Sequence, residues 1–142
     1  MGRLIGLDVG DVRIGIAVSD LLMLTAQGIE TYTRRNETDD ILYLCSVIKQ
    51  YSADTIICGL PKNMDGTIGE QAVKVRAFAE LLKSSAALPL VYWDERLTTK
   101  SAQRTLLEAD ISRKKRKEVV DKLAAVYILQ GYMDSIECMN MK

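Results

Sequence analysis

Two acidic positions stand out in the sequence because each lies at the end of an apolar segment. The first is Asp8, near the end of the apolar run 4–9 and on the same face of an extended strand as Leu4 and Gly6. A carboxylate in this setting loses hydration, so it needs hydrogen bonds, an ion pair or a bound cation. Taken alone, Asp8 is equally well explained as a residue that caps the following turn.

The second acidic position is the pair Asp94 and Glu95, directly after the apolar run 88–93. In extended geometry their side chains point in opposite directions, so one can face a site while the other supports the turn or pairs with Arg96. In α/β sheets, functional groups gather beyond the carboxyl ends of parallel strands. We therefore expect Glu95 and Asp8 to converge.

A third carboxylate, Asp121, lies within an apolar stretch near the end of the chain. Helical spacing places it in line with Ala124, Ala125 and Ile128, so it borders a face that should pack on the sheet. The two alanines would allow a close approach. A basic partner or a bound metal can each explain a charge at this place.

Composition narrows the chemistry further. The 142 residues are 48% apolar and include no histidine. This excludes Ser-His-Asp and Cys-His catalysis and His-ligated zinc, and it leaves carboxylates, metal-activated water, lysine, hydroxyls or a perturbed thiol. Magnesium prefers oxygen ligands, and a pair of such ions offsets the charge that protects a phosphodiester from attack. Three or four carboxylates therefore suffice for phosphodiester hydrolysis.

The remaining bulk properties favour one ordinary globular domain over residues 1–142. There is no run that could span a bilayer and no secretory pattern, so we expect a soluble, cytoplasmic protein with no membrane partner. The three cysteines lack the spacing of a metal site and are expected to be reduced. Basic and acidic residues number 19 each, so any attraction for nucleic acid must be local.

The apolar pattern changes period in an order typical of an α/β domain with a mixed sheet. A Gly10-Asp11 turn is predicted between the first two strands. The expected strands are 4–9, 12–19, 25–33, 55–60 and 88–93, and the expected helices are 38–51, 69–84, 98–109 and 117–133. This order of elements is that of a ribonuclease H-like domain, with a five-stranded mixed sheet flanked by helices.

Four motifs in the same order resemble the signatures of the YqgF family, also called RuvX, a bacterial branch of the ribonuclease H-like superfamily related to the RuvC Holliday junction resolvases. They cover almost the whole chain. The motifs are Asp8-Val9-Gly10, the segment 59–66 (GLPKNMDG), the segment 94–99 (DERLTT) and the segment 120–130 (VDKLAAVYILQ).

The resemblance implies a metal-dependent nuclease. It assigns Asp8, Glu95 and Asp121 as the catalytic carboxylates and metal ligands, with Mg²⁺ or Mn²⁺ as cofactor. It further implies maturation of the 5′ end of pre-16S ribosomal RNA, with resolution of branched DNA junctions as the alternative. The sheet order expected for this fold is 3-2-1-4-5, so Glu95 must reach Asp8 across the fourth strand. Gly59 at the end of that strand is expected to leave the space open.

Contacts with the substrate are predicted from basic and amide side chains. Lys62 and Asn63 lie in a loop that could touch phosphate, although a Pro/Asn/Asp-Gly turn explains the same residues without a ligand. Arg96, which follows Glu95, is also predicted to contact the substrate. The basic run 113–117 is the stronger indication, because it leads into the segment that carries Asp121. Its predicted phosphate-binding residues are Arg113, Lys114, Lys115 and Arg116.

Two other classes share some of these features. An ATP-binding domain of the actin, Hsp70 and sugar-kinase type has the same Asp-x-Gly hairpin, but such proteins enclose the nucleotide between two domains. A nuclease-like domain that binds ribosomal RNA or a protein without cutting it would keep the same residues. The sequence leaves open whether the chain forms a homodimer.

Overall fold

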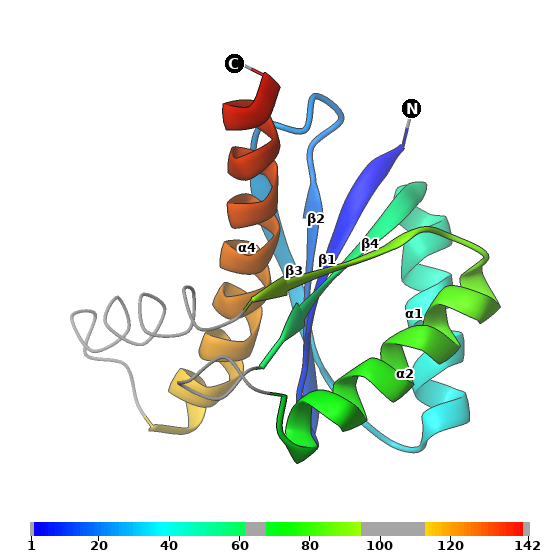
Figure 1. Ribbon diagram of the computed structural model, residues 1–142. Coiled ribbons are helices and arrows are strands. Elements are labelled where there is room, and N and C mark those ends of the chain that lie inside the picture. The colour runs from blue at the N-terminus through cyan, green and yellow to red at the C-terminus, as the bar shows by residue number, and fades with distance from the viewer. Residues whose placement is uncertain (1, 62–67, 95–112, 141–142) are drawn as a thin grey trace.

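The computed structural model describes residues 2–61, 68–94 and 113–140, and for 113–121 and 137–140 it describes the backbone alone. Figure 1 shows the arrangement of the elements. In chain order they are β1 (Arg3–Val9), β2 (Arg13–Ser19), β3 (Ala26–Thr33), α1 (Glu37–Tyr51), β4 (Ala53–Leu60), α2 (Glu70–Ala86), β5 (Leu90–Asp94) and α4 (Arg113–Asn140).

The five strands form one mixed sheet in the order β3-β2-β1-β4-β5, which confirms the predicted order. The β1–β2 and β2–β3 pairs are antiparallel, whereas β1–β4 and β4–β5 are parallel. The first strand of the chain is therefore the centre of the sheet. Its carboxyl end, where Asp8 lies, opens at the same edge as the carboxyl ends of β4 and β5.

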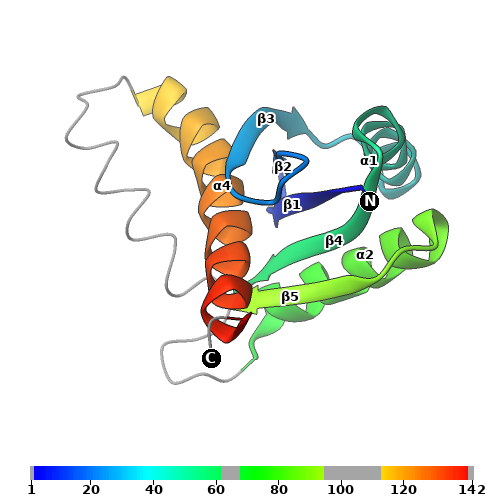
Figure 2. The same cartoon turned by 90° about the horizontal axis from the view of Figure 1, so that it is seen from above.

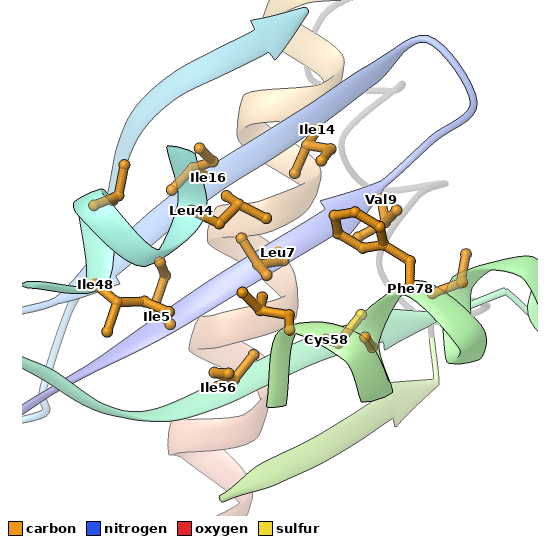
Figure 3. Packing of buried hydrophobic residues seen from close by; sticks show 14 of the residues in the cluster. Ile5, Leu7, Val9, Ile14, Ile16, Leu44, Ile48, Ile56, Cys58 and Phe78 are labelled. Carbon is orange, nitrogen blue, oxygen red and sulfur yellow. The ribbon is translucent and has the colours of Figure 1, made fainter. Parts of the chain in front are cut away.

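Helices cover both faces of the sheet, with α1 and α2 on one face and α4 on the other (Figure 2). On the first face, Leu7 packs among side chains of the other strands and of both helices, including Leu44 and Phe78 (Figure 3). On the second face, Leu4 of β1 joins Ile128 and Leu129 of α4. Alternate residues of β1 thus serve different layers, as the strand's period of two requires.

The helices on the first face form where the sequence predicts them. Asn36 caps α1, since its side chain accepts a hydrogen bond from the backbone N–H of Asp39 at 2.9 Å. The residues of α2 that are buried in the core are Ala72, Val75, Phe78, Ala79 and Leu82. No helix of the described residues is both long and apolar enough to cross a membrane.

Several element boundaries differ from the prediction, and two of these differences have a local cause. The turn after β1 is Asp11-Val12, because Val9 pairs with Ile14 and Gly10 donates its N–H to the carbonyl of Arg13 at 2.8 Å. The last helix begins at Arg113, several residues before the predicted start, because lysine and arginine are good helix formers and extend it backwards. The predicted helix 98–109 lies outside the described residues.

Candidate active site

Asp8 belongs to the α4 face of the sheet. It pairs with Gly15 of β2 and alternates with the buried Leu7 and Val9, which face the other layer. The space beside Gly6 confirms this direction, since a Cβ built on Gly6 would lie 2.8 Å from Cβ of Leu129. Asp8 is half-buried at the carboxyl end of the central strand. A carboxylate in this position is shielded from bulk water on the side that α4 covers.

Helix α4 runs antiparallel to β1 and brings its amino-terminal half toward Asp8. Ala26 of β3 contacts Gln130 of α4, whereas Gly28, two residues further along β3, lies beside Lys122. Because β3 is parallel to β1, α4 runs antiparallel to both strands. The same Cβ built on Gly6 would lie 3.1 Å from the carbonyl oxygen of Ala125. The backbone of Asp121 follows one helical turn nearer to the helix start, at the same end of the sheet as Asp8. Its side chain lies outside the described residues.

Glu95 lies outside the described residues, but the strand that leads to it is placed. Strand β5 ends at Asp94, which pairs with Leu60 at the end of β4. One pair earlier, Gly59 is opposite Trp93. Since adjacent strands lie roughly 4.8 Å apart, β5 is about 10 Å from β1. The strand β4 thus separates β1 from β5, as the sequence predicts.

Gly59 lies near the end of β4, between β1 and β5, on the face of the sheet that α4 covers. It is two residues after Ile57, which packs with α4, and Leu7 pairs with Cys58 one position before it. Continuing that register places Gly59 beside Asp8 and between Asp8 and Trp93. A position without a side chain therefore separates β1 from β5 at this edge, and the role expected of Gly59 stays a prediction.

The predicted substrate-binding residues are placed only in part. Lys62, Asn63 and Arg96 lie outside the described residues. The basic run 113–117 forms the first turns of α4, and this first turn contains no acidic residue. Because the amino end of a helix carries partial positive charge, the basic run and the helix dipole add at one place. The result is a concentrated positive region at the end of the helix that carries Asp121.

Arg34 and Asp40 form a buried ion pair that was not predicted from the sequence. Asp40 is 1% exposed, and its Oδ2 accepts a hydrogen bond from Nε of Arg34 at 2.9 Å. Its Oδ1 accepts from the hydroxyl of Tyr32 at 2.9 Å and from the N–H of Arg35 at 3.0 Å. Burial acts to raise the pKa of Asp40, but these hydrogen bonds outweigh it and the pKa lies below its usual range.

A signal for Asp40 was present in the sequence. Asp40 lies four residues before Leu44 on the stripe that α1 buries, together with Val47 and Ile48. An acidic residue on the apolar stripe of a helix requires a buried partner. The helical pattern therefore indicated a buried partner for Asp40, although it could not identify Arg34 as that partner.

The donor set fits a hard divalent cation. The predicted ligands are all carboxylates, whose oxygens Mg²⁺ and Mn²⁺ prefer, and Asp8 is half-buried at an edge that two other elements reach. Among the side chains that the structure describes, no three acidic, cysteine or histidine residues cluster closely enough to hold a metal. Two of the three predicted ligands are not among those side chains, so the set stays a prediction.

The sheet order and the layers of helices define a ribonuclease H-like domain. Its fold is similar to that of Thermus thermophilus RuvC, solved in complex with a Holliday junction substrate, with a TM-score of 0.62 and 10% identity over 96% of this chain and 97% of that one. It is also similar to the fowlpox virus resolvase solved with Holliday junction DNA, with a TM-score of 0.57 and 11% identity over 94% and 98% of the two chains.

The chain belongs to the RuvX family. The family profile, described as a Holliday junction resolvase, matches residues 2–135. A relative from Clostridium acetobutylicum is 58% identical over 134 residues, which are 94% of this chain and 99% of that protein. A relative from Clostridioides difficile is 56% identical over 94% of each chain. Both carry the name "Putative pre-16S rRNA nuclease".

Proposed function

We propose that this protein is a metal-dependent nuclease that hydrolyses phosphodiester bonds during maturation of the 5′ end of pre-16S ribosomal RNA in the cytoplasm. The observation that carries the proposal is the position of Asp8. It lies at the carboxyl end of the central strand, on the face that α4 covers. The names of the relatives and the family description support nucleic acid as the substrate.

In this proposal Asp8, Glu95 and Asp121 hold one or two divalent cations, Mg²⁺ or Mn²⁺. When bound, such an ion supplies activation of a water molecule and offsets negative charge on the phosphate. The chain's own contribution is to fix the carboxylates. Asp8 is fixed by pairing within the sheet, and Asp121 is carried by a helix packed closely on that sheet.

Phosphate recognition is assigned to basic residues around the same edge. Arg113, Lys114, Lys115 and Arg116 occupy the start of α4 and provide charge for the RNA backbone. Lys62, Asn63 and Arg96, which follow β4 and β5 in the sequence, are proposed to add further contacts. Contacts to phosphate position a nucleic acid without reading its sequence, so RNA structure must define where the cut is made.

A second candidate substrate is a branched DNA junction. The family description favours it, as do two proteins of similar fold, RuvC and the fowlpox virus resolvase, which were solved with Holliday junctions. The same carboxylates and the same charge would serve either substrate. Discrimination between them requires a direct comparison of cleavage.

The test incubates the purified protein with a 5′-extended pre-16S fragment and with a four-way DNA junction, each with Mg²⁺ or Mn²⁺. The variant Asp8→Asn should lower the cleavage rate on the order of 100-fold or more, since a ligand matters at least as much as the groups that orient it. The matched control is Asp54→Asn, an exposed carboxylate on β4 that hydrogen-bonds the N–H of Gly2.

Cleavage of the RNA fragment that depends on Asp8 supports the proposed function. Cleavage of the junction alone transfers the assignment to branched DNA. Binding of RNA without cleavage under either metal, or cleavage that survives Asp8→Asn, contradicts the nuclease mechanism and favours a binding module.

A further inference from the structure

Arg34 connects three parts of the structure on the side of the sheet opposite Asp8. Its Nε donates to Asp40 at the start of α1, and its Nη1 donates to the carbonyl of Gly10 at 2.9 Å. Its backbone N–H donates to the carbonyl of Val12, also at 2.9 Å. Arg34 therefore contacts the β1–β2 turn at two points, and Gly10 is only two residues after Asp8.

These contacts matter for the turn because few other interactions of the described residues fix its position. Within the hairpin, the closing hydrogen bond runs from the N–H of Gly10 to the carbonyl of Arg13. Asp11 and Val12, which form the turn, are both exposed. The guanidinium of Arg34 is the group that binds the carbonyl of Gly10 and so ties the exit of β1 to the helical layer.

Arg34 is itself held in place by two side chains, Asp40 and Phe78, and Tyr32 in turn supports Asp40. Asp40 fixes its Nε, and the face of Phe78 lies 4.6 Å from its guanidinium carbon. Phe78 is anchored beside Val9 in the core (Figure 3). Tyr32 donates to Asp40 and stacks on Tyr43, with 4.4 Å between ring centroids. The guanidinium is thus a rigid fork, a geometry that a lysine ammonium cannot reproduce.

We propose that Arg34, oriented by Asp40, is a positioning residue for Asp8. The fork fixes the end of β1 from the α1 side, and the carboxylate of Asp8 is directed to the α4 side of the same strand end. The proposal rests on the proposed function, in which Asp8 holds a divalent cation. It predicts that loss of the fork weakens metal binding while the fold is retained.

The decisive variant is Arg34→Lys, which keeps the charge and loses the fork. We expect the Mn²⁺ concentration for half-maximal cleavage to rise about tenfold, the effect typical of groups that orient a metal ligand. The dissociation constant of Mn²⁺ alone, measured by calorimetry, should rise by the same factor. Asp40→Asn keeps the side-chain shape but loses the charge that holds the guanidinium, so it should shift both quantities in the same direction.

Two controls separate positioning from stability. In Arg3→Lys the lost group also donates to a backbone carbonyl, that of Tyr51 at 3.1 Å, but at the opposite end of β1. Ile48→Val removes one buried methylene from α1 and lowers the melting temperature without touching the turn. Both controls should keep the wild-type requirement for Mn²⁺.

An unchanged Mn²⁺ requirement in Arg34→Lys overturns the positioning role, as does an equal rise in Ile48→Val. Should Arg34→Lys fail to fold, Asp40→Asn decides by the same criteria. If the wild type cleaves in a manner that depends on Asp8 while both variants keep its metal requirement, only the positioning role fails. If the wild type neither cleaves nor binds Mn²⁺, the proposed function fails and the positioning role fails with it.

Discussion

A buried carboxylate lowers stability unless donors surround it, and Asp40 has three of them. Because its pKa in the folded protein lies below the ordinary value, its contribution to stability is fully present above the pKa of the unfolded chain. That contribution is lost as the pH falls through the folded pKa. Asp40 therefore links the stability of the domain to acid pH.

We expect the free energy of unfolding of the wild type to fall as the pH is lowered below about 4. Asp40→Asn should be less stable at neutral pH and should lose less stability on acidification, because it has no proton to take up. Denaturant titrations between neutral and acid pH measure both effects. A curve for Asp40→Asn as steep as that of the wild type would contradict this account.

At the scale of elements, the contact between β1 and α4 sets the separation of two proposed ligands. The backbone of α4 approaches the sheet where β1 has Gly6 and β2 has the paired Ala17. The small residues on both sides were visible in the sequence, as Gly6 and the alanines 124 and 125. What the sequence could not give was the register of the helix along the strand, because this depends on contacts between residues more than 100 positions apart.

We expect Gly6→Ala to cost about 1–3 kcal/mol, since the new methyl group would lie 2.8 Å from Cβ of Leu129 and 3.1 Å from a backbone carbonyl. Neither atom can move without moving α4, so cleavage should fall as well. Gly28→Ala is the matched control on β3, where the three atoms nearest to the new methyl group all belong to the flexible side chain of Lys122. Its cost should be below about 1 kcal/mol, and equal losses in the two variants would contradict the prediction.

The sequence predicted most of the elements, because periodicity depends only on local spacing. It placed the first turn one residue early, since Gly-Asp and Asp-Val are both acceptable turns and the pairing of Val9 with Ile14 decides between them. It missed Arg34 as the partner of Asp40 for a related reason. Ion pairs that close a hairpin against a helix leave no periodic trace.

At the scale of the whole molecule, basic and acidic residues are equal in number but unevenly distributed. The basic run at the start of α4 lies at the carboxyl-end edge of the sheet, whereas Lys49 and Lys83 lie in the last turns of α1 and α2. Net charge alone therefore gave no indication of a polyanionic partner. The clustering of five basic residues in the sequence did, and the structure adds that they share the positive end of a helix.

Replacing Lys114, Lys115 and Arg116 by glutamine should weaken RNA binding and reduce the slope of log K against log salt by about 2 for a single strand. The melting temperature should not fall, because the basic residues repel the positive end of the helix. Binding measured over a series of salt concentrations tests the slope. The double variant of Lys49 and Lys83 to glutamine should retain it, and an unchanged slope in the triple variant would remove the run from the binding surface.

The central place of β1 has a consequence for folding. β1 pairs with the later strand β4 on one side and is covered on one face by α4, so its neighbours come from distant parts of the sequence. The surroundings of Asp8 are therefore complete only when α4 has packed on the sheet. In the proposed nuclease, the metal site forms together with these long-range contacts, so no single segment of the chain can form it.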